Sequence, residues 1–527
     1  RRHTRLQGDW SSDVCSSDLI NKELTMARRA SARAAKQAQR AKAPEINPCP
    51  PGQIGGQYKP LSDSQVKKIY NESLRILEQI GMTDVPKVLE KQALAHGAKL
   101  NNQDRLCFPP SMVESIISSA CKEFTFFGRE SMHDIVVGGD KVYFGTGGAA
   151  VQTLDMNTDE YRPSTLKDLY DFTRLIDQLQ NVSWFTRCCI ATDVHDNYEL
   201  DVNTAYALLK GTTKPVGMSF HIDEHVDPII DMFDLALGGK GKFSEKPFCK
   251  AHISPVISPL KFGEDAVMVA IACMKRGIPI NNIIAAMPGA TSPGPIAGSL
   301  SLTLAETLST LIMTNVFEPG YPMIFGNWPL AIDLRTGAFR GGSGEMALLN
   351  AASAQLSNSL GLPSGCASSM SDAKAPDAQM GMEKALTALA CGLAGGNMVY
   401  ESSGMMASLL GASFEAFVMD DEMLSLVYRM IRGIEVNEQS LEFDSIQSVV
   451  SDTGHFLGQP ETMLSMERDY FYPSIADREE PTVWQEQGAL DHLSRAKTKA
   501  KELLNHHPDY LSDEVDASIR KKYPILL

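Results

Sequence analysis

A dense group of reactive side chains lies in the run Ser-Asp-Ala-Lys-Ala-Pro-Asp-Ala-Gln at residues 371–379. This run follows a short apolar segment, precedes a helical one, and brings two carboxylates, an amine and an amide close together. One interpretation is a loop in which an aspartate caps the helix. We favour the other, a site at the end of a strand. The predicted catalytic residues of this run are Asp372, Lys374 and Asp377, and Gln379 is a substrate-binding candidate.

Aromatic side chains recur near the ends of several apolar segments. The faces of Trp, Tyr and Phe rings attract cations, and a cage of them suits a quaternary ammonium, which cannot be held by hydrogen bonds. For any one of these rings, ordinary core packing is the competing interpretation. Trp328 is the strongest candidate, because Gly-Asn-Trp-Pro is typical of a strand that turns into a loop. The aromatic candidates for substrate binding are Phe144, Trp184, Phe220, Phe325, Trp328 and Tyr400.

Polar side chains near the same segment ends could bind the charged end of a small substrate. His221 and His252 lie late in apolar runs, where a hydrogen-bonded structural histidine is an equal alternative. A substrate carboxylate would need a cationic or hydrogen-bonding partner, and His221, His252, Arg340 and Lys374 are the candidates. Asn327 and Glu401 complete the predicted substrate-binding set.

Other kinds of site are poorly supported. The runs Gly145-Thr-Gly-Gly and Gly341-Gly-Ser-Gly fit neither the dinucleotide fingerprint nor the phosphate-loop pattern, and turn glycines explain them better. No Ser-His-Asp arrangement emerges, and no clustered Cys and His pattern indicates a structural zinc, so we expect no metal site. The ten cysteines are too irregularly spaced in 527 residues to indicate a disulfide framework.

Charge and hydropathy limit the partners. A net charge of −15 argues against a general affinity for nucleic acid, because no basic field would replace the phosphate counterions. The basic segment 26–42 could contact an acidic partner, although a solvated disordered tail explains it better. Gly, Pro, Ser and Asn interrupt the long apolar runs, so we expect no membrane span. We see no cleavable signal peptide and predict a cytoplasmic protein.

The first residues are set apart from the fold. Residues 1–20 resemble translated sequencing-adapter text, being rich in Ser and Asp without apolar periodicity. Met26 is the plausible native start, and we treat residues 1–25 as a non-native segment.

The candidates must be positioned by the elements between residues 136 and 440, where short β-rich runs alternate with helical stretches. Such alternation is typical of a parallel α/β fold, and eight such units are what a (β/α)₈ TIM barrel requires. An open doubly wound sheet is the structural alternative. In a barrel, the site lies at the carboxyl ends of the strands. The predicted strands are 141–146, 181–190, 215–221, 247–254, 280–286, 322–328, 362–368 and 396–401.

Helical segments flank the predicted barrel. A Pro- and Gly-rich lead-in follows the basic arm within residues 26–60. An N-terminal helical cap is expected over 61–135, with Ser62-Asp63 capping its first helix and two more helices at 85–96 and 111–120. A C-terminal helical extension is expected over 441–527, with a charged helix at 489–506.

Four segments of the chain resemble those of a known family: KVYFGTGGAAVQTLD at 141–155, NWPLAIDLRTGAFRGGSGEMALLNAASAQL at 327–356, SMSDAKAPDAQMGMEKA at 369–385, and GHFL at 454–457. Through them, residues 60–500 resemble the trimethylamine methyltransferase family. The resemblance implies a barrel that passes a methyl group to the Co(I) centre of a separate corrinoid protein, in one-carbon metabolism such as methanogenesis. The corrinoid is then supplied by that partner, and no cofactor is held tightly. The resemblance also adds Met370, at the position that matches pyrrolysine, to the predicted catalytic residues.

One departure from the family pattern narrows the substrate. Members that demethylate trimethylamine carry pyrrolysine just before Ser-Asp-x-Lys, and Met370 holds that place here. Methionine cannot form the amine adduct that pyrrolysine's imine allows. A quaternary amine needs no such help, because it leaves as a neutral tertiary amine when its methyl group is displaced. Met370 therefore favours a quaternary amine, with glycine betaine as first choice. The alternative is that Met370 only fills a gap in the core.

Other functions stay open at this point. The chain could be a methylamine methyltransferase without pyrrolysine, a non-catalytic barrel that binds betaines, or a barrel enzyme that uses Lys374 as a Schiff base. We also expect a homo-oligomer.

Overall fold

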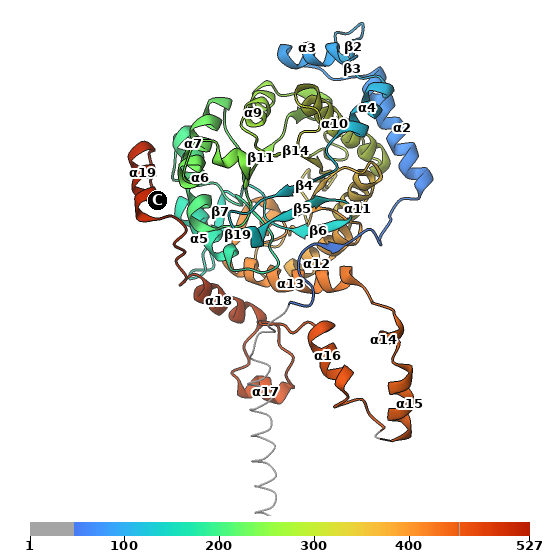
Figure 1. Cartoon of the computed structure of the whole chain (residues 1–527), viewed down its shortest axis with the longest axis vertical. Helices are drawn as coiled ribbons and strands as arrows, with labels where there is room; N and C mark the ends of the chain where they lie inside the picture. Colours follow the sequence, from blue (N-terminus) through green and yellow to red (C-terminus); the bar gives the residue numbers. More distant parts are fainter. Residues whose placement is uncertain (1–46, 453) are drawn as a thin grey trace, which may run out of the picture.

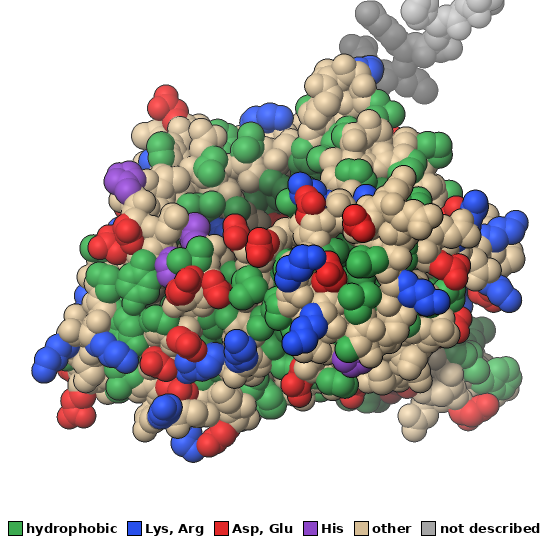
Figure 2. Space-filling model, turned by 90° about the horizontal axis from the view of Figure 1, so that it is seen from above, with side chains coloured by type: hydrophobic (Ala, Val, Ile, Leu, Met, Phe, Trp, Pro, Cys, Tyr) green, Lys and Arg blue, Asp and Glu red, His purple; other side chains and the backbone are tan. Residues whose placement is uncertain are grey.

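The computed structural model describes residues 47–452 and 454–527. The predictions for residues 1–25, and for the lead-in as far as residue 46, concern residues outside these ranges. On the face seen in Figure 2, Lys and Arg side chains are interspersed with Asp and Glu, and no extended basic field covers the described residues there.

A closed parallel sheet forms the centre of the fold (Figure 1). Within the described residues, its eight parallel strands are neighbours in chain order, and each lies inside one of the predicted runs. The short strand β1 (Gln53–Ile54) adds a ninth, antiparallel strand beside β6. The ring closes where Phe144 and Val182 form a parallel bridge and the Ser183 N–H donates to the Phe144 carbonyl oxygen, 2.8 Å away. The prediction of a (β/α)₈ barrel is confirmed. The strands are β6 (Lys141–Phe144), β9 (Phe185–Thr186), β10 (Val216–Met218), β11 (Cys249–Ile253), β14 (Ile280–Ile284), β15 (Met323–Asn327), β16 (Ser364–Ala367) and β17 (Met398–Tyr400).

A helix follows each strand and covers the outside of the ring (Figure 1). Outward-facing strand residues pack against this layer: Asn282 donates to the Thr314 hydroxyl, and the ring of Phe144 lies edge-on to Tyr428. The helices are α5 (Leu166–Asp177), α6 (Asn197–Gly211), α7 (Val226–Ala236), α9 (Glu264–Lys275), α10 (Ile296–Phe317), α11 (Gly344–Ser359), α12 (Ala378–Leu393) and α13 (Phe414–Arg432).

Helix α10 is the most deeply enclosed of these helices. Among the described residues it is the one helix long and apolar enough to cross a membrane by length and composition, and 83% of its apolar window is buried inside the protein. The reason is that α10 has the barrel on one side and the N-terminal helices α2 (Asp63–Gln79), α3 (Lys87–Ala95) and α4 (Pro110–Ser119) on the other. It therefore serves as a core helix.

The N-terminal segment folds as the sequence predicts and adds two hairpins. Helix α2 begins after Ser62, whose side chain and that of Gln65 form a capping box. The hairpin of β2 (Lys99–Leu100) and β3 (Leu106–Cys107) lies beside α3 in Figure 1. The hairpin of β4 (Glu123–Phe126) and β5 (Ile135–Gly138) leads into β6, and its Phe126 ring lies 6.0 Å from the Lys250 amine inside the barrel. This second hairpin therefore closes the amino end of the barrel.

A small second sheet stands at the opposite end of the barrel. Its strands, in spatial order, are β18 (Met405–Met406), β19 (Gly411–Ser413), β7 (Gln152–Leu154) and β8 (Tyr161–Pro163). They come from the loops that follow β17 and β6, so the sheet covers part of the mouth formed by the carboxyl ends of the strands.

The C-terminal helices fall into two groups. Helix α18 (His492–Leu503), which matches the predicted charged helix, packs on α13, and α19 (Asp513–Lys522) packs on α7. Helices α14 (Glu438–Leu441), α15 (Phe443–Ser451) and α16 (Pro460–Arg468) instead project away from the barrel in Figure 1, and α17 (Pro481–Glu486) lies below it.

A buried carboxyl group on α10 should make the stability of the fold pH-dependent. The Glu306 side chain is fully buried and accepts hydrogen bonds from the Ser258 hydroxyl and the Leu260 N–H, and burial raises its pKa to about 7. Because the unfolded chain has the lower pKa, this group stabilises the fold most at low pH and loses that contribution as pH rises toward 7.

We predict that the stability difference between the wild type and Glu306→Gln changes by up to about 3 kcal/mol, at the wild type's expense, between pH 4.5 and 8. Urea unfolding at a series of pH values measures it. The control Glu72→Gln, on the exposed side of α2, should alter stability by less than about 0.5 kcal/mol. Parallel pH curves for the wild type and Glu306→Gln would contradict the prediction.

Candidate active site

Four rings gather inside the barrel around Tyr400. The Tyr400 ring centroid lies 4.8 Å from that of Trp328, 5.1 Å from Trp184 and 5.5 Å from His252, and the His252 and Trp328 centroids are 5.4 Å apart. His252 lies in β11 and Tyr400 in β17, whereas Trp184 directly precedes β9 and Trp328 directly follows β15. Alternate residues of a barrel strand point inward, and the faces of such rings attract cations.

A buried lysine and a buried glutamate adjoin this aromatic cluster. The Lys250 amine donates to the Thr186 hydroxyl, 2.8 Å away, and lies 4.5 Å from the centroid of the Tyr400 ring. Burial lowers the pKa of Lys250 to about 7 and raises that of Glu401 to about 8. Glu401 directly follows β17, has φ +63°, and packs its carboxyl group against Gly147 and Gly148. Burial thus favours the neutral form of each group, while the charge of each favours the charged form of the other.

Arg187 brings a further positive charge to the mouth. It directly follows β9 and is partly buried. Burial lowers the pKa of His252, and the charges of Lys250 and Arg187 lower it further. The Arg187 charge also opposes the rise in pKa that burial causes at Glu401. Asp201 most favours the charged form of Arg187, but its oxygens accept from His221 and His225. No described side chain or carbonyl group pairs with the Arg187 guanidinium. Its planar set of donors, which matches a carboxylate, is thus available to a ligand.

Several buried polar atoms near the cluster lack a hydrogen-bond partner among the described residues. They are Asn281 Oδ1, Trp328 Nε1 and Glu401 Oε2. Gly365 keeps the space between two of them open, because a Cβ there would lie 3.3 Å from both Asn281 Oδ1 and Trp328 Nε1. Buried polar groups are nearly always paired in folded proteins. Asn281 Oδ1 and Trp328 Nε1 are thus available to a polar ligand in the same part of the barrel.

Glycine at position 217 gives Lys250 its place. A Cβ at this position would lie 2.6 Å from the Thr186 hydroxyl oxygen and 2.8 Å from the Lys250 amine. A larger residue at position 217 would push the Lys250 amine away from the aromatic cluster.

The run 371–379 forms a clasp at the rim of the mouth. The Asp372 carboxylate accepts from the Gly341 N–H and the Ser408 hydroxyl, and Glu383 accepts from Ser371 and from the Asp372 N–H. These bonds join the loops that follow β15, β16 and β17. The predicted site residue Asp372 is therefore placed where it shapes the mouth.

The other residues of this run lie on its outer side. Lys374 is exposed and donates to the Asp372 carbonyl oxygen, and Gln379 is exposed and donates to Glu383. Asp377 caps α12 by accepting from the Met380 N–H, which is the helix-capping interpretation of the sequence. Met370, just before the run, is fully buried and packs against Gly341.

A buried ion pair holds this loop and the one after β17. The Lys384 amine lies 2.9 Å from Asp420 Oδ2, with the two side chains 0% and 2% exposed. Lys384 also donates to the Ser369 carbonyl oxygen, and Asp420 accepts from the Gly404 N–H. The pair thus fixes the backbone at Ser369, directly before Met370, and at Gly404, three residues after Glu401.

The structure separates several predicted substrate-binding residues from the cluster. Phe144 packs on α13, and Phe325 pairs in register with the outward-facing Asn282, so both belong to the outer layer. Arg340 is bound to Asp333, and His221 is exposed and bound to Asp201. Two other predicted residues are buried at strand ends: Phe220, just past β10, and Asn327, whose amide has no partner among the described residues.

Sequence reasoning missed Arg187, Lys250 and Asn281. Arg187 and Lys250 are single basic residues inside runs predicted as buried strands, NVSWFTRCCI and PFCKAHIS. A lone charge in such a run is a usable signal, because lysine and arginine are rarely buried without a partner. Within the described ranges, no group of three or more His, Cys, Asp or Glu side chains could hold a metal ion.

The chain is similar to several proteins that are named as methyltransferases. The profile of the trimethylamine methyltransferase family (MTTB) matches residues 27–523. The glycine betaine methyltransferase of Desulfitobacterium hafniense strain Y51 is 30% identical over 473 residues, which cover 89% of this chain and 97% of that protein. The trimethylamine methyltransferase MttB of Methanosarcina thermophila is 29% identical over 469 residues, covering 88% and 95%. The monomethylamine methyltransferase structure from Methanosarcina barkeri covers 86% of this chain and 95% of its own, with 13% identity and a TM-score of 0.45.

The Lys384–Asp420 pair should be essential to the stability of the loops at the mouth. Lys384→Met leaves an uncompensated buried carboxylate, so we predict a loss of about 3–5 kcal/mol in the free energy of unfolding. The double variant Lys384→Met/Asp420→Leu should lose markedly less, because both charges are removed. Chemical denaturation measures these changes.

The matched control is Lys167→Met on α5, which removes an exposed lysine whose Nζ lies 2.7 Å from Asp171 Oδ2 and leaves Asp171 paired with Arg174. It should change stability by less than about 0.5 kcal/mol. Equal losses in the single and double variants would show that the charge pair itself is not responsible.

Proposed function

Because the chain belongs to the trimethylamine methyltransferase family and is a methyltransferase, we propose a specific donor and acceptor for it. The donor is a quaternary amine that carries a carboxylate, of the glycine betaine type. The acceptor is the Co(I) centre of a separate corrinoid protein. We also propose that the reaction takes place in the cytoplasm, since the nine cysteines of the described residues are all free thiols.

The observation that carries the choice of donor is the pairing of an aromatic surface with unfilled cationic donors. Trp184, Trp328 and Tyr400 offer ring faces for an ammonium group, while Arg187 offers unused N–H donors for an anion. A betaine has one group for each. Trimethylamine has no anionic group, and its protonated form would meet the positive charge of Arg187 without a compensating contact.

Lys250 and Glu401 add to this selectivity. A protonated Lys250 amine strengthens the anion site, and a protonated Glu401 carboxyl group is a hydrogen-bond donor. Burial favours the neutral form of each group. Arg187 supplies the positive charge that a substrate carboxylate balances.

The chemistry of the step fits a site without a covalent adduct. The Co(I) electron pair attacks the methyl carbon, the carbon–nitrogen bond breaks, and its electrons leave with a neutral tertiary amine; glycine betaine thus gives dimethylglycine and a methyl–Co(III) corrinoid. No proton moves. The protein's contribution is to desolvate the ammonium and aim its methyl group at the mouth, which is catalysis by positioning. The buried thioether of Met370, in the place of pyrrolysine, offers no group for an adduct with the amine and is compatible with this role.

The proposal predicts a distinct substrate preference. With cob(I)alamin or a purified corrinoid protein as acceptor, glycine betaine should give methylcobalamin and dimethylglycine, followed by absorbance and mass spectrometry. Tetramethylammonium, which has the same cationic methyl groups but no carboxylate, should react at least tenfold less efficiently in kcat/KM. Trimethylamine should give no product. Failure of every quaternary amine would refute the proposal, as would a preference for trimethylamine.

A second prediction assigns the carboxylate site. Arg187→Met removes a charge-assisted hydrogen bond, so we expect KM for glycine betaine to rise by about ten- to a hundredfold, while the value for tetramethylammonium changes much less. Lys250→Met should act in the same direction. The control Arg340→Met removes an arginine that is already bound to Asp333 and should leave both values near those of the wild type. The reverse result, with Arg340 critical and Arg187 dispensable, would move the carboxylate site to the loop after β15.

A further inference from the structure

A segment of the C-terminal region is apolar on its surface to an unusual degree. We call residues 434–472 the arm; it contains α14, α15 and α16. Thirteen of its large apolar side chains are exposed. Five of them are more than 70% exposed: Ile434 (87%), Val436 (71%), Phe443 (73%), Val450 (74%) and Leu457 (79%). The others are Leu441, Ile446, Phe456, Met463, Leu464, Met466, Tyr470 and Tyr472.

The arm has no core of its own. Among its described apolar residues Val449 alone is buried, and α15 and α16 have nine residues each, too few for a stable helix in isolation. Between them lies an open cleft of about 420 Å³ lined by Phe456, Leu457 and Met466. Contiguous exposed apolar surface of this kind is typical of a protein interface.

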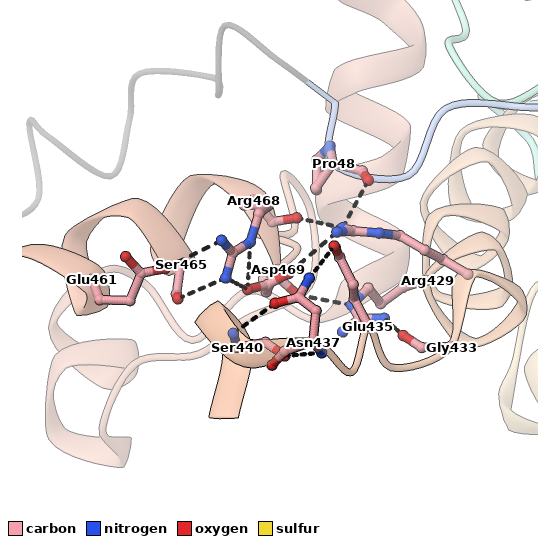
Figure 3. A network of polar contacts seen from close by, with 11 residues as sticks. Pro48, Arg429, Gly433, Glu435, Asn437, Ser440, Glu461, Ser465, Arg468 and Asp469 are labelled. Carbon is pink, nitrogen blue, oxygen red and sulfur yellow. Dashed lines mark hydrogen bonds and ion pairs between the residues drawn. The ribbon is translucent and has the colours of Figure 1, made fainter. Parts of the chain in front are cut away.

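The arm is nonetheless firmly attached at its base (Figure 3). Arg432, at the end of α13, pairs with Asp469 at 3.2 Å and donates to the Pro48 carbonyl oxygen. Arg429 donates to the Asp469 carbonyl oxygen, and Arg468 pairs with both Asp469 and Glu461. Both ends of the arm are therefore anchored to α13, and the apolar part between them projects outward.

The base of the arm lies at the end of the barrel away from the mouth. Helix α13 runs back from the carboxyl ends of the strands, and the carbonyl oxygen of Ile431 accepts from Gln57. Gln57 closely follows β1 (Gln53–Ile54), which pairs with the first residues of β6. A methyl acceptor must approach the opposite end, at the mouth. The arm is thus poorly placed to bind a corrinoid protein during methyl transfer.

A matching apolar strip runs over the outer face of α12 and α13. Met382 and Leu386 are 66% and 51% exposed on α12, and Leu426 and Met430 are 46% and 56% exposed on α13. Each pair is spaced by four residues and so lies on one side of its helix. Beside the strip, a groove of about 520 Å³ between the two helices is lined by the methionines Met380, Met419 and Met423, side chains that adapt well to a partner's shape.

We propose that the arm of one copy of this chain packs on the α12–α13 face of a second copy, which returns the same contact. The strip leads along α13 to the base of the arm, so a two-fold axis near α13 brings each arm over the other copy's strip, as a self-complementary interface requires. The area is sufficient: thirteen exposed side chains of on the order of 100 Å² each exceed the roughly 800 Å² per partner of a stable interface.

Light scattering coupled to size exclusion tests the proposal on the full chain. The wild type should be a dimer. The arm variant Val450→Glu/Leu457→Glu and the face variant Met382→Glu/Leu386→Glu should both be monomers that keep their fold, because all four side chains are exposed. The control Met132→Glu changes a side chain that is 80% exposed on the 3-10 turn Ser131–His133, and it should remain a dimer.

Mixing the two variants tests reciprocity. A heterodimer of arm variant and face variant keeps one intact contact of the two, whereas each variant alone keeps none. The mixture should therefore contain dimer at concentrations where the separate variants do not. A monomeric wild type, or arm and face variants that remain dimeric, would overturn the proposal. So would an arm variant that stays dimeric but no longer methylates the corrinoid protein, since the arm would then serve the acceptor.

Discussion

The buried pair of Lys384 and Asp420 is the constraint on which the mouth of the barrel depends. Two charges that are almost fully shielded from water are tolerated only when each is paired and its remaining hydrogen-bonding capacity is used. Here the remaining capacity is used by backbone: Lys384 binds the Ser369 carbonyl oxygen and Asp420 binds the Gly404 N–H. The hydrogen bonds that offset the cost of burying the pair thus come from two loops, and these loops carry Met370 and Glu401.

Polar groups inside the barrel, by contrast, are buried without a full set of hydrogen bonds. Lys250, Asn281 and Glu401 are buried with part of their hydrogen-bonding capacity unused, and the Arg187 guanidinium has no partner among the described residues. Such groups destabilise a fold unless a ligand satisfies them. The Lys384–Asp420 pair outside the barrel holds the loops at the mouth in place. Such support is needed because unpaired polar groups inside the barrel would otherwise move to bind one another.

The order of the strands was predictable from sequence, whereas the direction of individual side chains was not. Apolar runs separated by Gly, Ser and Pro mark each strand within a few residues. A shift of one residue, however, moves a side chain to the other face of the sheet. Phe144 and Tyr400 occupy similar positions in the sequence pattern, yet Phe144 faces α13 and Tyr400 faces the barrel interior. The clasp at 371–379 shows the same limit, since its charged residues mark the site while mostly pointing away from it.

Helix α13 contributes both to the loops at the mouth and to the attachment of the arm. Its first half supplies Asp420 to the frame of the mouth, its exposed side carries Leu426 and Met430, and its last residue, Arg432, anchors the arm. Contacts on the outer side of the helix therefore bear on the same rigid body that positions Glu401. An interface on this helix would stabilise the loops at the mouth without contributing a residue to the site.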